Sequence, residues 1–133
     1  RWLRLFNTEE LRVLVTGDDT PIDVEDLRRN TVYGGYHEKD MAVQYFWEAL
    51  SLLDQASLKA FLRFVTSSPN PPLLGFSELN PKFAIRHAGD DITRLPTAST
   101  CVNLLKLPAY NSTAQCLEKV KYAIYSGAGF DLS

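Results

Sequence analysis

Two amphipathic helical patterns follow one another directly in the middle of the chain, and they limit the possible folds most strongly. In residues 39–53 apolar side chains recur at helical spacing, and Val43 and Trp47 widen that face, which predicts a mostly buried helix. Asp54 is placed to cap a second helix, whose apolar stripe is Leu58, Phe61, Leu62 and Val65. Residues 67–76, SSPNPPLLGF, end this helix because closely spaced prolines cannot continue it.

Shorter helices are expected on both sides of this pair. Asn7 and Glu10 have the spacing of a capping box for a helix that Gly17 would close, and Asp23 can cap another helix that reaches about Asn30. Residues 17–21 between them are turn-forming and predict a linker.

A last helix is predicted near the C-terminal end. Ser112 and Gln115 form an S-x-x-Q capping box, and Gly127 would end the helix. Its inner face is expected to consist of Leu117, Val120 and Ile124, with Cys116 and Ala123 beside them.

Two segments between these helices are strand candidates. Residues 83–87, FAIRH, form a short one, and residues 101–107, CVNLLKL, form a stronger one flanked by prolines. Residues 33–36, YGGY, are expected to redirect the backbone, and residues 96–100 to form a loop. The pattern predicts one mixed α+β domain with its helices packed on a small sheet.

Composition excludes several functional classes. The 133 residues carry 14 basic and 16 acidic side chains spread along the chain, which does not favour a nucleic-acid surface. The apolar runs are too short to span a bilayer, and no signal-peptide pattern opens the chain. The start at Arg1-Trp2-Leu3 looks like a cut through a longer protein. Two cysteines fifteen residues apart indicate a reducing compartment, cytoplasmic or nuclear.

Cys101 has two interpretations on the residues alone. Free cysteine is among the most often buried residues, which favours a small core residue. Its position at the start of a strand, after a loop of small side chains, instead favours an accessible sulfur. The sequence lacks the C-x-x-C of thioredoxin-type redox sites, a phosphate-binding arginine after the cysteine and a convincing zinc ligand set. His37 or His87 remains open as the base of a cysteine hydrolase.

The other candidate residues are expected to be structural. Cys116 lies on the apolar face of the last helix, while His37, His87 and the pair Asp90-Asp91 are expected to be structural or solvated. Phe130 lies between glycines and the chain end, where it either ties down the terminus or anchors a partner.

The segment LPTASTCVNLLKLPAY, residues 95–110, resembles the cysteine segment of the HECT family of ubiquitin ligases, in which Leu-Pro precedes a Thr-Cys and an Asn follows two residues later. Four further blocks are similar to the family in the same order: FNTEELRVLVTG, TVYGGYHEKDMAVQYFW, FLRFVTSSPNPPLLGF and YAIYSGAGFDLS. The resemblance covers nearly the whole chain, and the proteasome-associated branch is most similar.

The resemblance implies two regions and a set of site residues. Residues 1–18 would be the tail of the larger N-terminal lobe and the start of a hinge, and residues 19–133 the C-terminal lobe. Cys101 would accept ubiquitin, and Thr100, which precedes it, would help to position it for transfer. Phe130 and Asp131 would help position or receive the incoming lysine. Many family members have histidine where this chain has Ser99, so no general base is assigned.

The resemblance also implies a function and its partners. The protein would take ubiquitin as a thioester from a conjugating enzyme, which docks mainly on the N-terminal lobe, and pass it to a lysine of a protein substrate. The branch adds the proteasome as a partner, and no cofactor or metal is expected. The alternatives are a non-catalytic lobe that binds ubiquitin or a partner, an unrelated cysteine hydrolase, and a packing module with a buried thiol.

Overall fold

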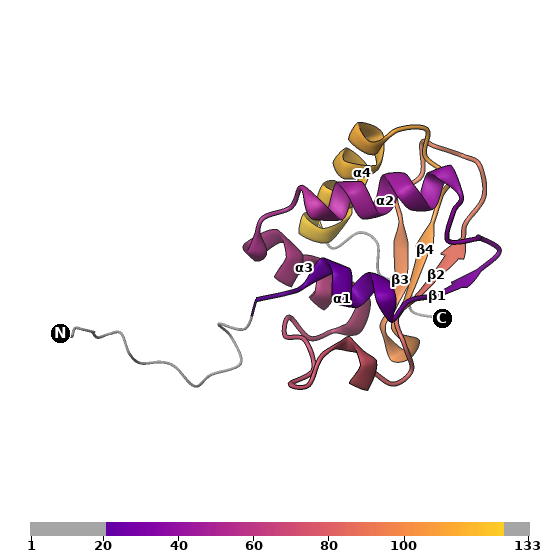
Figure 1. Cartoon of the computed structure of the whole chain (residues 1–133). Coiled ribbons are helices and arrows are strands. Elements are labelled where there is room, and N and C mark those ends of the chain that lie inside the picture. The colour runs from indigo at the N-terminus through magenta and orange to yellow at the C-terminus, as the bar shows by residue number, and fades with distance from the viewer. Residues whose placement is uncertain (1–20, 127–133) are drawn as a thin grey trace.

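The computed structural model describes residues 21–126, in which four helices lie on one face of a small sheet (Figure 1). The helices are α1 (Val24–Arg29), α2 (Met41–Ser51), α3 (Gln55–Thr66) and α4 (Thr113–Ser126). The strands are β1 (Val32–Gly34), β2 (Ala84–His87), β3 (Thr97–Ser99) and β4 (Leu104–Leu107). Two single-turn 3₁₀ helices complete the described part, η2 (Phe76–Glu78) and η3 (Thr100–Val102). The predicted α+β class, with helices packed on a small sheet, is confirmed.

The helices begin where their capping residues predict. The Asp23 carboxylate accepts hydrogen bonds from the first-turn amides of α1, and that of Asp54 accepts one from the Ser57 amide at 2.8 Å. At α4 the Ser112 hydroxyl accepts from the Gln115 amide at 3.1 Å. The Gln115 side-chain oxygen accepts a hydrogen bond from the amide of Asn111, one residue before the expected partner. These caps satisfy amides that a helix leaves without internal partners.

The sheet has the strand order β1-β2-β4-β3, in which only β3 runs antiparallel to its neighbour. The strand predicted at 83–87 is confirmed as β2. The strand predicted at 101–107 is wrong at its beginning, because β4 starts at Leu104 and the preceding residues form a turn. The strands β1 and β3 lie in segments for which the sequence indicated only a turn and a loop.

One row of side chains across the sheet faces the helices. Tyr33, Ile85, Leu105 and Ala98 occupy matching register positions on the four strands, and the last three are fully buried. Against them pack aromatic rings from the helices and from the segment before β2, which meet edge-on or tilted: Phe46, Trp47, Phe61 and Phe83. This contact between sheet and helices forms the core.

The buried face of α4 differs from the predicted one. Cys116, Val120 and Ala123 are buried, whereas Leu117 and Ile124 are only partly buried at the edge of the core. The side chains at positions i, i+4 and i+7 therefore form the centre of the stripe. The helix predicted at 7–17, most of the linker at 17–21 and the helix end at Gly127 lie outside the described residues. Within residues 21–126, no helix has the length and apolar character needed to cross a membrane.

Candidate functional site

Cys101 lies at the tip of the hairpin that joins β3 to β4. Ser99 pairs with Leu104, so residues 100–103 form a four-residue connection at one end of the sheet. The first three of these residues make the 3₁₀ turn η3, in which the side chain of Cys101 is exposed. Thr100 is half-buried, and Val102 is 45% exposed. The strand-start location predicted for Cys101 is therefore wrong in detail. Of the two interpretations left open, an exposed residue agrees with the accessible thiol and not with the core residue.

Asn103 closes this turn in the left-handed conformation, with φ 53° and ψ 46°. Asparagine is one of the few non-glycine residues that adopt this conformation at small cost. Its side-chain amide donates to the Pro81 carbonyl at 2.8 Å, and its own carbonyl accepts from the Ala84 amide at 3.0 Å. Asn103 is only 7% exposed. The turn is therefore fastened to the segment that leads into β2.

A hydrogen bond within the turn and contacts with α3 give the turn further support. The Thr100 carbonyl accepts a long bond of 3.4 Å from the Asn103 amide, which closes the turn internally. Helix α3 packs against η3 and against β3, so the turn is supported by a helix that has one face buried in the core. The sulfur is thus presented from a supported backbone, which suits a group that must meet another protein in a defined direction.

The second cysteine has the opposite environment. Cys116 is fully buried on α4, and burial raises the pKa of its thiol from 9.0 to about 12. Because the thiolate is the nucleophilic form, this residue is chemically inert in the folded chain. The predicted structural role of Cys116 is confirmed.

Both histidines of the chain lie at the other end of the sheet from Cys101. Strands β2 and β4 are parallel, with Ala84 opposite Leu104 and His87 opposite Leu107, so His87 lies about 10 Å farther along the sheet than Leu104 at roughly 3.3 Å per residue. Cys101 precedes Leu104 on the opposite side. His37 follows β1 beyond the same far end as His87. Neither imidazole can serve as a base for the Cys101 thiol in this arrangement.

Local contacts occupy the polar groups at the far end. The His87 ring lies 4.6 Å from that of Tyr36 and 3.6 Å from the carboxylate of Asp90, whose side chain is 89% exposed. Asp91 accepts hydrogen bonds from the amide and hydroxyl of Thr93, and these bonds lower the pKa of its carboxyl. The expectation that Asp90 and Asp91 form a solvated loop is confirmed.

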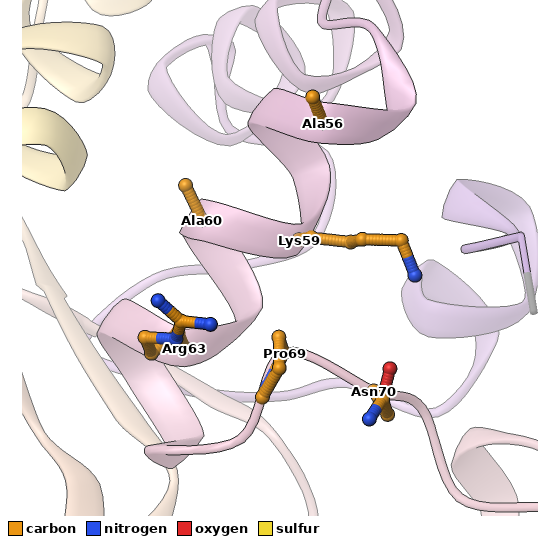
Figure 2. A pocket seen from close by; sticks show the side chains of 6 residues that line it. All are labelled: Ala56, Lys59, Ala60, Arg63, Pro69 and Asn70. Atoms are coloured by element: carbon orange, nitrogen blue, oxygen red, sulfur yellow. The ribbon is translucent and has the colours of Figure 1, made fainter. Parts of the chain in front are cut away.

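A hollow of about 400 Å³ lies between α3 and the loop that follows it, and neither Cys101 nor its neighbours in η3 line it. Figure 2 shows Ala56, Lys59, Ala60 and Arg63 on the helix and Pro69 and Asn70 on the loop that follows it. It contains no thiol, hydroxyl or carboxylate side chain that could act as a nucleophile. Across residues 21–126, no cluster of three or more histidine, cysteine or acidic side chains is arranged to bind a metal ion.

Phe130 and Asp131 lie outside the described residues, so the arrangement of the site rests on the turn around Cys101. Sequence reasoning noted the asparagine two residues after the cysteine only as part of a motif and missed its place in the geometry. The signal was available in its residue type, because asparagine after a short turn often adopts a left-handed conformation.

Comparison with known proteins adds the chemical class. The HECT-domain (ubiquitin-transferase) family matches residues 1–133. The chain is 53% identical over 132 residues to E3 ubiquitin-protein ligase HUL5 of Saccharomyces cerevisiae, covering 99% of this chain and 14% of that protein. It is 45% identical over 138 residues to E3 ubiquitin-protein ligase UPL6 of Arabidopsis thaliana, covering 99% and 13%.

A human relative, Ubiquitin-protein ligase E3B, is 41% identical over 158 residues, with 99% of this chain and 15% of that protein covered. The chain therefore spans about one seventh of the length of these curated relatives. The family match covers this chain along its whole length. The α+β fold and the exposed Cys101 at the hairpin turn are consistent with this match. The chain belongs to the HECT-domain family of ubiquitin transferases.

Proposed function

We propose that the protein containing this chain transfers ubiquitin, and that Cys101 is the nucleophile that carries it. The observation that carries this proposal is the exposed Cys101 sulfur at the tip of a turn held by Asn103 and supported by α3. Family membership supplies the substrate class, since several relatives are named ubiquitin-protein ligases. The boundary between an N-terminal lobe tail at 1–18 and a catalytic lobe at 19–133 is part of the same proposal.

In the first step the Cys101 thiolate attacks the carbonyl carbon of the thioester between ubiquitin and a conjugating enzyme. A new carbon–sulfur bond forms to Cys101, the bond to the conjugating enzyme breaks, and that enzyme leaves as a thiolate. One thioester replaces another, so little net free energy is needed. An ordinary thiol is a few per cent ionised at neutral pH, so the step can proceed without a neighbouring imidazole.

In the second step a neutral lysine amine attacks the thioester carbonyl. A carbon–nitrogen bond forms, the bond to Cys101 breaks, the Cys101 thiolate is restored, and the amine gives its extra proton to a base or to solvent. We assign Thr100 to supporting the thioester, and Phe130 and Asp131 to placing the incoming lysine. The support for these three roles is their match to the family motif and, for Thr100, its place in η3.

The partners follow from this chemistry. They are ubiquitin, a conjugating enzyme that docks mainly on the preceding lobe, and lysine-bearing protein substrates, with the proteasome added by the similarity to one branch of the family. The two free cysteines support a reducing compartment, cytoplasmic or nuclear.

Strand β3 is at the edge of the sheet and leads directly into the turn that carries Cys101. An extended peptide such as the ubiquitin C-terminus can add to a sheet edge through its backbone. Along an edge strand in an antiparallel pair, the amides point alternately toward the neighbour and outward. Thr97→Pro and Ala98→Pro therefore remove amides that point in opposite directions, one toward β4 and one outward. The variant that loses the outward amide should keep its fold but lose a donor to the added peptide. Native thioester yield in that folded variant would show that this mode of binding is wrong.

The deciding experiment is a non-reducing gel of the full-length protein with activating enzyme, a conjugating enzyme and ubiquitin. We expect an adduct that reductant removes, that Cys101→Ala abolishes and that Cys116→Ala retains. Cys101→Ser should give an adduct that resists reductant but is cleaved by alkali, because the bond is then an ester. A folded protein that forms no adduct with any of several conjugating enzymes would instead be a non-catalytic binding lobe. An adduct that only hydrolyses to free ubiquitin would indicate a hydrolase.

A further inference from the structure

We propose that Asn103 is a positioning residue for ubiquitin transfer, whose side-chain amide holds the Cys101 turn in the orientation that thioester exchange requires. This inference rests on the proposed role of Cys101. It assigns to Asn103 a function beyond that of a residue that merely fits a left-handed turn.

Asn103 ties the turn to a different segment at two points. Its side chain donates to the Pro81 carbonyl at 2.8 Å, and its backbone carbonyl accepts from the Ala84 amide at 3.0 Å. Ala84 is the first residue of β2, and Pro81 precedes it in the segment that leads into this strand; β2 pairs with β4 inside the sheet. The turn is therefore fixed to the middle of the sheet and not only to its own hairpin.

The hydrogen bond from the Asn103 side-chain amide to the Pro81 carbonyl is buried and directional. Asn103 is 7% exposed, so water replaces a lost partner poorly, and the Pro81 carbonyl can accept only from a donor. An aspartate at this position has the same shape but presents an oxygen to that carbonyl, and the two would repel. A glycine adopts the left-handed conformation even more readily but has no side chain to donate.

Asn103 is also close in the chain to the reacting sulfur. It lies two residues after Cys101 and ends the 3₁₀ turn through its amide contact with the Thr100 carbonyl. Any rotation of Asn103 is passed directly to the backbone that carries the sulfur. Misplacement of a reacting group by about 1 Å can slow a reaction on the order of 100-fold. A small reagent that approaches an exposed thiol from many directions is far less sensitive to such a shift.

The test compares two rates in the full-length protein for Asn103→Gly, Asn103→Asp and the native residue. One rate is thioester formation from a charged conjugating enzyme, with kcat and KM separated. The other is alkylation of Cys101 by iodoacetamide. We expect both variants to lower kcat for loading at least about 10-fold, with KM little changed and alkylation within about two-fold of native.

Val43→Ala is the matched control for general loss of stability. Val43 is a fully buried side chain of α2, which packs against α1 and α4, and its truncation should lower the melting temperature while the folded protein loads ubiquitin at the native kcat. A loss of loading in this control equal to that in the Asn103 variants would overturn the inference.

Two further results would overturn it. Native kcat in Asn103→Gly would mean that only the left-handed backbone matters, and a fall in alkylation parallel to that in loading would indicate a general loss of thiol reactivity. Failure of the native protein to load ubiquitin would remove the proposed function together with this inference. A native protein that loads, beside Asn103 variants that load equally well, would remove only the inference.

Discussion

The two cysteines should differ by orders of magnitude in their reaction with iodoacetamide in the folded protein. Cys116 is fully buried, and its pKa is raised from 9.0 to about 12 by burial. Three pKa units reduce the thiolate fraction about 1,000-fold at any pH well below both values. Exclusion of the reagent by the surrounding core protects this thiol further. Cys101 is exposed, so the reagent can reach it in the folded protein.

Each cysteine is best compared with itself in concentrated urea, where both are accessible. The assay is peptide mass spectrometry of the alkylated protein over time, with Cys101→Ala and Cys116→Ala to assign each rate. We expect Cys101 to react at a rate close to its unfolded rate, and Cys116 to react at least about 1,000-fold more slowly than its unfolded rate. Global unfolding does not limit this contrast, since domains of ordinary stability are unfolded far less than 0.1% of the time.

Two outcomes would refute the reasoning. Reaction of folded Cys116 within about ten-fold of its unfolded rate would mean that α4 does not cover its thiol as described. Strong protection of Cys101 would mean that the turn does not present the sulfur, and the chain would then fit the packing module with a buried thiol.

Three further predictions concern stability and pH. Ser112→Ala should destabilise the protein by about 1 kcal/mol in urea unfolding, because the Gln115 amide loses its cap, whereas Ser112→Asp should retain most of the stability. The unfolding free energy should fall as pH rises from about 9 toward 12. Burial raises the pKa values of Cys116 and Tyr36, so the folded state keeps protons that the unfolded state releases. Urea midpoints measured across this range should decline less steeply in Tyr36→Phe than in the native protein. In single-turnover gels, the rate of ubiquitin discharge from Cys101 to free lysine should rise with pH toward the amine pKa of about 10.4. An inflection of this rate near pH 6.5 would instead indicate an imidazole base.

The helices could be predicted from the sequence because their signals are local. Asp23, Asp54 and Ser112 mark helix starts by short side-chain contacts, and the apolar spacing after each marks the buried face. Cys116 could be assigned to the core for the same reason. The caps therefore located α1, α3 and α4 to within a residue or two.

The short strands could not be predicted because their pairing is non-local. Strands β1 and β3 have three residues each, too few for an alternating pattern, and they exist because β2 and β4 offer partners. The start of β4 was misplaced because residues 101–103 are apolar or neutral and continue the strand pattern. Only the left-handed Asn103 separates the turn from the strand, and its bond to Pro81 spans 22 residues of sequence.

The placement of the histidines distinguishes between the chemistries that the sequence left open. A cysteine hydrolase pairs its thiol with an imidazole within hydrogen-bond reach, since one group must activate the sulfur and then a water molecule. Here Cys101 lies before β4, while His87 is the last residue of β2 and His37 follows β1, both at the opposite end of the parallel strands. Exchange between two thioesters has no such requirement, because the leaving group and the nucleophile are the same kind of sulfur. A lone, exposed and well-supported thiol therefore fits the proposed thioester exchange better than it fits hydrolysis.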